Sequence, residues 1–171
     1  FFGVQALILC PTRELADQVG KELRRLARGV ANIKLVSLCG GKPAGPQRAS
    51  LEQGAHLVVG TPGRVLDHLN GKTLKLDSLK TLVLDEADRM LDMGFAEAVA
   101  EIVAHTPKNR QTLLFSATYP DEIRRMSRSI QRNPVTVSVE TEHQAGVIEQ
   151  IRGLDGDFDL DDLIARARSF P

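Results

Sequence analysis

The chain has 171 residues, 42% of them hydrophobic and 26% charged, which fits one globular domain with a single core. Lysine plus arginine and aspartate plus glutamate both number 22, so bulk charge gives no indication of a nucleic-acid partner. Any such binding must come from local geometry. No apolar run is long enough to span a bilayer, so we expect no membrane partner.

Cysteine usage and the start of the chain indicate the cellular setting. Cys10 and Cys39, the two cysteines, form no C-x-x-C pair, and the four histidines are scattered. This favours buried, reduced thiols in a cytosolic protein over a structural zinc site. The chain starts at Phe1 rather than methionine and lacks the basic segment of a signal peptide. We therefore expect a piece of a longer cytoplasmic protein.

Alternating strands and helices are predicted along the chain. Short apolar runs predict buried strands at residues 4–10, 33–38, 55–59, 79–84, 111–115 and 135–139. Apolar residues at helical spacing predict helices at residues 12–28, 47–53, 65–69, 95–105 and 123–132. This alternation predicts an α/β fold with a mostly parallel sheet and helices on both faces. The basic residues of the first and last helices are expected on solvated faces.

The end of the chain is acidic, with five aspartates between residues 155 and 162. A calcium loop would need glycine at its sixth position and glutamate at its twelfth, but these are Leu160 and Arg166. A short helix capped by Asp159 explains the pattern better, because its acids fall in the first turn and its arginines in the last.

Three carboxylates, Asp85, Glu86 and Asp88, end the strand at 79–84. Buried carboxylates are costly unless a positive group meets them, and ligands bind at the carboxyl ends of parallel strands. Asp85 can hold Mg²⁺ through water, and Glu86 can orient or deprotonate a water that attacks a γ-phosphate. Asp88 can instead bind the hydroxyls of Ser116 and Thr118. The alternative is a helix start whose acids favour the helix dipole.

Four other strand ends carry turns rich in Gly, Pro, Ser, Thr and Arg. In a parallel sheet these turns lie at one edge, beside the acids. Helix amino termini attract phosphate, glycine lets a phosphodiester backbone approach closely, and arginine can bind two phosphate oxygens. Any one of these turns alone would be an ordinary connector. The turns are residues 11–14, 40–41, 61–64 and 116–118.

These motifs also occur in the order found in a known family. They read Pro11-Thr12-Arg13-Glu14-Leu15-Ala16, Gly40-Gly41, Thr61-Pro62-Gly63-Arg64, Asp85-Glu86-Ala87-Asp88 and Ser116-Ala117-Thr118. From about residue 3 to 140, the chain resembles the amino-terminal RecA-like domain of DEAD-box ATP-dependent RNA helicases, a three-layer sandwich. Residues 38–41 and 91–95 resemble the bacterial DbpA type most, which acts on ribosomal RNA.

The resemblance implies two groups of functional residues. Asp85 and Glu86 would serve Mg²⁺–ATP and hydrolysis, and Ser116 and Thr118 would couple hydrolysis to unwinding with Asp88 as their partner. A second group would grip one RNA strand by its sugar–phosphate backbone, without base specificity and with 2′-hydroxyls distinguishing RNA from DNA. This second group consists of Thr12, Arg13, Gly41, Thr61, Gly63 and Arg64.

The chain also departs from the family pattern. It contains neither the phosphate-binding loop, G-x-x-x-x-G-K-[ST], nor the family's adenine-reading glutamine motif, and both are expected before Phe1. Residues 1–140 are thus expected to be a RecA-like domain that is incomplete at its N-terminus. A linker-like segment and an unassigned tail are expected at 141–171, and a second RecA-like domain, with its arginine finger, after about residue 150. Without the strand before the phosphate loop, neighbouring strand edges should be unpaired and prone to aggregation.

The expected function follows from this pattern. The parent protein is predicted to be an ATP-dependent RNA helicase that separates short RNA duplexes and acts on a structured RNA, while the isolated chain is predicted to be inactive. Two alternatives stay open: a non-catalytic RNA-binding module that ignores nucleotide, and a Mg²⁺-dependent nuclease built on the acids.

Overall fold

The structure is a computed structural model that describes residues 3–139 and 148–152, the last five as backbone. A strand lies on each predicted apolar run, whereas α4 and β7 were not expected as elements. The strands are β1 Ala6–Leu9, β2 Leu35–Leu38, β3 Leu57–Gly60, β4 Thr81–Leu84, β5 Gln111–Ser116, β6 Val135–Val139 and β7 Ile148–Arg152. The helices are α1 Arg13–Leu26, α2 Ala44–Glu52, α3 Pro62–Asn70, α4 Ala87–Asp92, α5 Ala96–Ala104 and α6 Asp121–Ile130, with a 3₁₀ turn at Ala27–Gly29.

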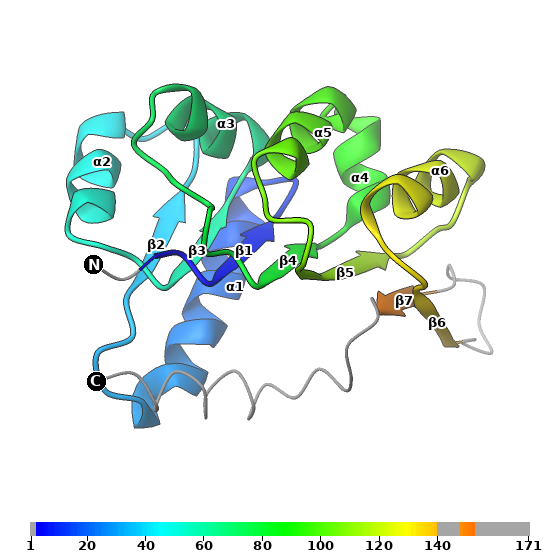
Figure 1. Ribbon diagram of the computed structural model, residues 1–171, viewed down its shortest axis with the longest axis horizontal. Coiled ribbons are helices and arrows are strands. Elements are labelled where there is room, and N and C mark those ends of the chain that lie inside the picture. Colours follow the sequence, from blue (N-terminus) through cyan, green and yellow to red (C-terminus); the bar gives the residue numbers. More distant parts are fainter. Residues whose placement is uncertain (1–2, 140–147, 153–171) are drawn as a thin grey trace.

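One sheet runs through the molecule in the order β2-β3-β1-β4-β5-β7-β6 (Figure 1). The first five strands in this order are mutually parallel, and β7 is antiparallel to both of its neighbours. β5 and β6 therefore run in the same direction on either side of β7. The predicted class, α/β with a mostly parallel sheet, is confirmed.

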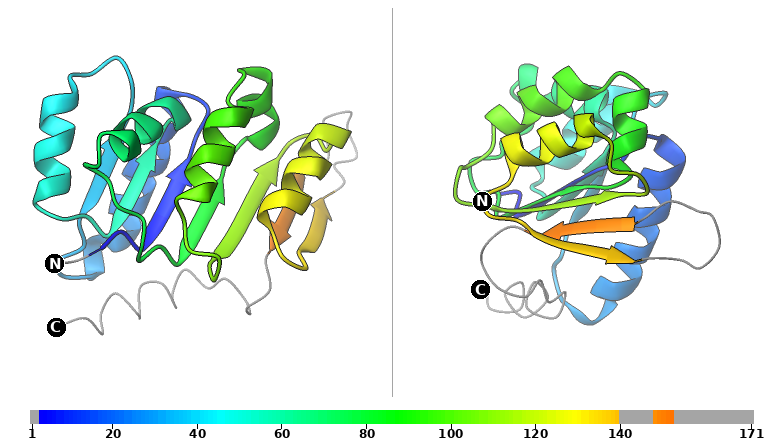
Figure 2. Two further views of the ribbon diagram at one scale, coloured as in Figure 1. Left: turned by 45° about the horizontal axis from the view of Figure 1, so that its top comes forward. Right: turned by 90° about the vertical axis from the view of Figure 1, so that its right-hand side faces the viewer.

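Helices cover both faces of the sheet, so the molecule has three layers (Figure 2). α1 covers one face, where Ala16 packs against side chains of β1 and β3 such as Ile8 and Val59. The other described helices lie over the opposite face, on a larger core that includes Leu7, Leu84 and residues of all the neighbouring strands. None of the helices among the described residues could cross a membrane.

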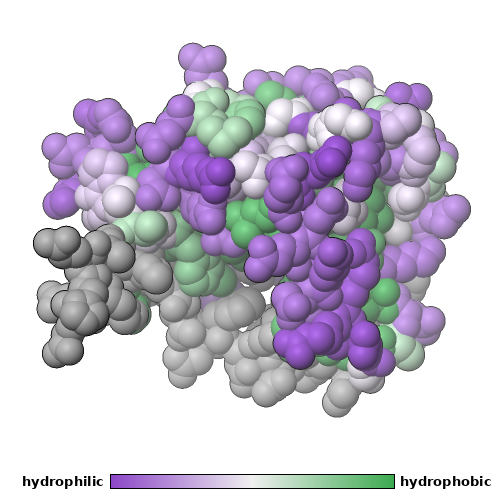
Figure 3. Space-filling view, turned by 180° about the vertical axis from the view of Figure 1, so that it is seen from behind, coloured by the Kyte–Doolittle hydropathy of each residue, from purple (hydrophilic) through white to green (hydrophobic). Residues whose placement is uncertain are grey.

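The outer side of α1 is polar, as its sequence predicts. Lys21, Arg24 and Arg25 are exposed, and Arg25 pairs with Glu22 at 2.8 Å between Nε and Oε2. Seen from behind, this side of the molecule is largely hydrophilic (Figure 3). The interpretation as a solvated face holds for this helix.

The expectation of an unpaired edge was wrong for β5. β7 pairs with β5 from Leu113 to Ser116, so that Phe115 lies opposite Gln150. Part of the segment predicted as a linker thus forms a strand. Open edges in the described part of the chain lie on β2 and β6, and β6 exposes the side chains of Val135 and Val137. The other residues of the predicted linker-like segment and tail, 141–147 and 153–171, lie outside the described residues.

Candidate functional site

The carboxyl ends of the five parallel strands lie at one level. Leu38 pairs with Gly60, Gly60 with Leu9, Leu9 with Leu84, and Leu84 with Leu114. The segments that follow these residues therefore emerge together at the carboxyl edge of the sheet. The structure thus brings the predicted turns and the predicted acids to a single edge.

Asp85 is the first of the acids beyond β4. Its backbone N–H donates to Leu9 O at 3.0 Å, which extends the pairing of β4 with β1 by one residue. The side chain is partly buried, and no cation lies within ion-pair distance of it among the described residues. Burial, and then the charge of Glu86, raises the pKa of Asp85 above its usual range. The site therefore carries a negative charge that the described residues do not neutralise.

Glu86 has a backbone conformation that is unusual for a glutamate. It precedes α4 with φ 50° and ψ 54°, in the left-handed region, where a residue with a Cβ is strained by roughly 1–2 kcal/mol. Its Oε2 lies 3.3 Å from Arg89 Nη1 in a partly exposed ion pair. This conformation sets the direction in which the carboxylate leaves the strand end.

The donor set fits a hydrated magnesium ion better than a metal caged by protein. No group of three His, Cys, Asp or Glu side chains that could hold a metal occurs in the described part of the chain. Mg²⁺ keeps several waters and is usually bound by one or two carboxylates together with substrate phosphates. The partly buried, unneutralised carboxylate of Asp85 meets that requirement.

Asp88 joins the ends of β4 and β5. Its Oδ2 accepts hydrogen bonds from the Thr118 hydroxyl at 2.8 Å and from the Thr118 backbone N–H at 3.0 Å. Ser116 Oγ accepts from the Asp88 N–H at 3.3 Å and donates to Thr118 O at 2.6 Å. The Ser116 hydroxyl also helps to lower the pKa of the Asp88 carboxyl group. The structure thus places Ser116 and Thr118 beside Asp88.

These hydrogen bonds also control the charge of Asp88. Burial by itself raises the pKa of this carboxyl group. The hydrogen bonds from the Thr118 hydroxyl, from the Arg89 and Thr118 amides and from the Ser116 hydroxyl outweigh burial, and the pKa is lowered overall. Asp85 and Asp88 are only three residues apart, yet their pKa values shift in opposite directions.

A second group of turns lies around Gly41, which has φ +72°. A Cβ at Gly41 would come within 3.2 Å of Arg13 Nη1, so the exposed Arg13 guanidinium lies beside this turn. Thr12 caps α1, as predicted, because its Oγ1 accepts from Leu15 N at 3.3 Å. Arg13 has no carboxylate partner in the described part of the chain. It is therefore a suitable cation for an anionic ligand.

The turn after β3 places Thr61, Gly63 and Arg64 at the start of α3. The Thr61 side chain does not cap the helix, and a Cβ at Gly63 would meet no atom within 4 Å. The Arg64 side chain is only 15% exposed. Its Nη1 donates to Lys42 O at 2.9 Å, and its Nε lies 3.5 Å from an Asp67 carboxylate oxygen. Arg64 thus holds the turn at Gly40-Gly41 (the glycine turn), in addition to any contact with a ligand.

Sequence reasoning missed the buried polar side chains that hold these turns. Gln47 Nε2 donates to Cys39 O at 3.0 Å, directly before the glycine pair. Gln47 Oε1 lies 3.2 Å from His68 Nε2, and His68 Nδ1 lies 2.7 Å from Thr73 Oγ1. A chain of hydrogen bonds thus connects the glycine turn to α3. No sequence motif indicates it, because the residues that it joins lie far apart along the chain.

Comparisons with known proteins agree with this geometry. The family model described as DEAD/DEAH box helicase matches residues 2–126. The chain is 55% identical over 149 residues to the ATP-dependent RNA helicase DbpA of Escherichia coli. This match covers 87% of this chain and 33% of that protein. It is 49% identical over 149 residues to the ATP-dependent RNA helicase CshA of Listeria monocytogenes, and this match covers 86% of this chain and 28% of that protein. The chain thus spans about a third of the length of the curated relatives it matches.

A solved structure is similar as well. The crystal structure of a DEAD box protein from the hyperthermophile Methanococcus jannaschii superimposes with a TM-score of 0.73 at 46% sequence identity. The match covers 77% of this chain and 36% of that one. This confirms the predicted RecA-like form of the α/β fold.

Proposed function

The chain belongs to the DEAD/DEAH box helicase family, and from that premise we propose that it is part of an ATP-dependent RNA helicase that separates short RNA duplexes. The proposal is supported above all by the arrangement at the carboxyl edge. There the Asp88–Thr118 contact joins the ends of β4 and β5 directly beside Asp85 and Glu86.

The acids have separate roles in this proposal. Asp85 would hold Mg²⁺ through water, and the ion would neutralise charge on the β- and γ-phosphate oxygens of ATP. Glu86 would orient or deprotonate the attacking water. The Asp88, Ser116 and Thr118 group would couple the nucleotide state to the RNA, because it ties the acidic segment to the segment after β5.

RNA would lie along the turns of β1, β2 and β3. Arg13 would contact a backbone phosphate, while Gly41 and Gly63 would let the backbone approach closely, and Thr61 would contribute a hydroxyl. Thr12 and Arg64 would act mainly by holding these turns in place, since each already contacts its own surroundings. Such contacts carry no base sequence, so binding would be non-specific and would weaken with salt.

Nucleotide binding would need more than the residues of this chain. The 171 residues contain no G-x-x-x-x-G-K-[ST] loop, and a second RecA-like domain would supply the arginine that acts on the γ-phosphate. We expect the isolated chain to release no phosphate from ATP, with or without RNA. RNA-stimulated release that disappears in Glu86→Gln would contradict this.

A chimera tests the proposed function directly. Residues 3–139 of this chain would replace the matching segment of the E. coli relative, and RNA-stimulated phosphate release would be measured. We expect activity in the chimera and a loss of roughly a hundredfold or more with Glu86→Gln. An inactive but folded chimera that still binds RNA would instead favour the RNA-binding module, whose affinity for RNA is independent of ATP.

The target and the cellular setting are also proposals. We infer a structured, ribosomal RNA target from the resemblance to the DbpA type, and a reducing cytoplasm from the thiols. Cys10 and Cys39 are buried and free, and burial, then the charges of Asp85, Cys39 and Glu86, raises the pKa of Cys10 to about 12. Such thiols are inert at neutral pH.

A further inference from the structure

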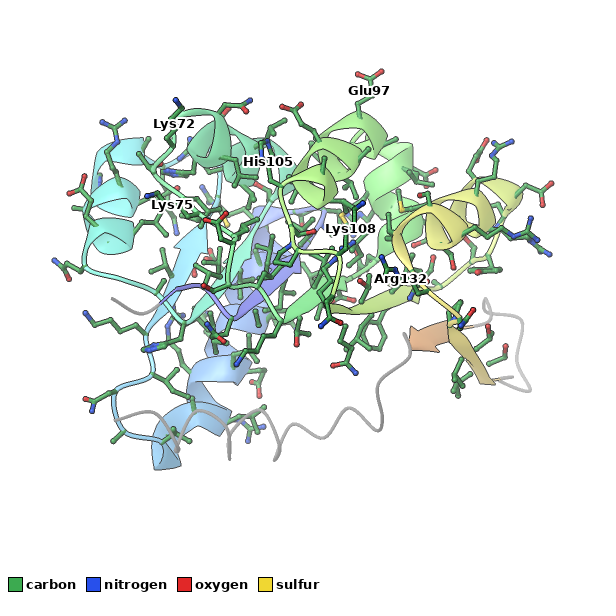
Figure 4. All side chains as sticks on the ribbon, in the orientation of Figure 1. Lys72, Lys75, Glu97, His105, Lys108 and Arg132 are labelled. Atoms are coloured by element: carbon green, nitrogen blue, oxygen red, sulfur yellow. The ribbon has the colours of Figure 1, made fainter. Side chains whose placement is uncertain are left out.

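The amino edge of the sheet carries a basic pocket that the proposed function does not use. This pocket, of about 500 Å³, lies between the segment leading into β5 and the end of α6. Its polar lining comes from two stretches of chain that are far apart in the sequence but meet at the start of β5. Figure 4 labels Lys108 and Arg132, one from each stretch. The polar lining residues include Lys108, Asn109, Arg110, Gln111, Ser129 and Arg132.

The basic pocket contains cations without matching acids. None of the described residues that line it is an aspartate or glutamate. Lys108, Arg110 and Arg132 form no ion pair with any carboxylate of residues 3–139. By contrast, Arg124 and Arg125 at the start of α6 pair with Asp121 and Glu122, at 3.7 and 3.8 Å. These two arginines at the start of α6 are thus paired, whereas the cations that line the pocket are not paired with any carboxylate of the described residues.

Arg110 lies deepest of the three cations. Its Nη1 donates to Pro107 O at 2.9 Å and its Nη2 to Ile130 O at 3.3 Å, while Nε is buried without an acceptor among the described residues. Burial, and then the charge of Arg132, lowers the pKa of Arg110. The two carbonyl contacts explain Arg110 as a brace for the end of α6. They do not explain why further cations are placed beside it, where like charges repel.

We propose that the basic pocket binds a phosphate group. The three cations that line this pocket together exceed the single charge of a carboxylate, and guanidinium and ammonium groups donate well to phosphate oxygens. Asn109, Gln111 and Ser129 add neutral hydrogen-bonding groups at the rim. The phosphate comes either from the free ion or from an RNA backbone. Because this pocket lies at the opposite edge of the sheet from the acids, the inference is independent of the proposed function.

The first experiment titrates the 171-residue chain with inorganic phosphate in a low-salt chloride buffer, followed by backbone amide NMR. We expect saturable shifts at Asn109, Gln111 and Arg132. The double variant Lys108→Ala/Arg132→Ala should weaken phosphate binding on the order of tenfold. Arg128→Ala removes the same charge from α6 outside the pocket and should change affinity less than twofold. Glu86→Gln should have no effect, which separates this test from that of the proposed function.

The second experiment identifies the source of the phosphate with a short single-stranded oligouridylate. If the source is RNA, the double variant weakens oligonucleotide binding by a similar factor and inorganic phosphate competes with the RNA. If only phosphate binding is affected, the source is the free ion. Shifts that do not saturate, or an equal loss with Arg128→Ala, would overturn the proposal. The wild-type shifts at Asn109 and Gln111 keep it falsifiable even if the double variant does not fold.

Discussion

Each end of the parallel strands has a partly buried charged side chain without an ion-pair partner in the described part of the chain, an acid at the carboxyl edge of the sheet and a cation at the amino edge. Among the described residues, no cation pairs with the partly buried Asp85 at the carboxyl edge, and no carboxylate pairs with the partly buried Arg110 at the amino edge. At the carboxyl edge, Gln47 and His68 hold the turns through buried hydrogen bonds. At the amino edge, Arg110 and the buried Gln131 hold the end of α6 beside two exposed cations. A site for a phosphate-bearing ligand can thus contain an unpaired acid or an unpaired cation, provided that hydrogen bonds hold the surrounding backbone in place.

The largest expected effect tests how rigid the carboxyl edge is. A Cβ at Gly60 would lie 2.4 Å from Leu38 O and 2.9 Å from Val65 Cγ2, so Gly60→Ala would push apart the ends of β2 and β3. We expect a loss of about 3 kcal/mol or more in the free energy of unfolding, measured with urea.

Gly63→Ala is the matched control for this substitution. A Cβ there meets no atom within 4 Å, so stability should change by less than about 1 kcal/mol. If Gly63 lets RNA approach, the same variant should nonetheless bind RNA more weakly. Equal losses of stability in both variants would show that the carboxyl edge is not rigid at Gly60.

The next effect concerns the polar brace at the same edge. Gln47→Leu would leave Cys39 O and His68 Nε2 without a buried partner, and we expect a loss of about 2 kcal/mol in the free energy of unfolding. The exposed Gln18→Leu, on α1, serves as control and should change stability by about 0.5 kcal/mol or less. A loss in Gln47→Leu no larger than in the control would mean that the glycine turn does not depend on this hydrogen-bond chain.

The carboxyl edge could be predicted from the sequence to a large extent. Parallel strands deliver the residues that follow them to one edge, so short contiguous motifs after each strand were enough to place Asp85, Arg13 and Thr118 together. The sequence did not show which functional side chains are also structural. Arg64, predicted to bind phosphate, is mostly buried because it also bonds to a carbonyl 22 residues away.

The amino edge and the end of the sheet could not be predicted in this way. Lys108 and Arg132 lie on segments separated by β5 and α6, and each alone looks like an ordinary solvated cation. β7 pairs with β5 although the two strands are far apart in the sequence, and no local pattern of residues indicates this partner. Sequence motifs thus do not predict side-chain contacts or strand pairings between residues that are distant in the sequence.

A smaller effect compares the two arginines of the amino edge. Arg110→Leu would remove two hydrogen bonds to carbonyls while relieving repulsion from Arg132, and we expect a net loss of about 1 kcal/mol in the free energy of unfolding. Arg132→Leu should be neutral at moderate salt and slightly stabilising at low salt, because only the repulsion is removed. Equal losses for both would assign Arg132 a structural role and would weaken the case for an anion.

The smallest effect depends on pH and contrasts the acids at the carboxyl edge. The pKa of Asp88 is lowered by folding, so its stabilising contribution is complete above its unfolded pKa and disappears as the pH falls through its folded pKa. Asp88→Asn should therefore cost about 1 kcal/mol at pH 7, discounted for partial exposure, and nothing at a pH below the folded pKa of Asp88. Asp92→Asn, at the exposed end of α4, should change stability by about 0.5 kcal/mol or less at both pH values.

Asp85 should behave in the opposite way, which makes the contrast testable within one segment. Because folding raises the pKa of Asp85, its ionised form opposes folding above its folded pKa, and Asp85→Asn should stabilise the chain at pH 7 but not at low pH. Urea unfolding at the two pH values measures both variants. If Asp85→Asn destabilised the chain at pH 7, its carboxylate would already have a partner. The unneutralised charge proposed to hold magnesium would then be absent.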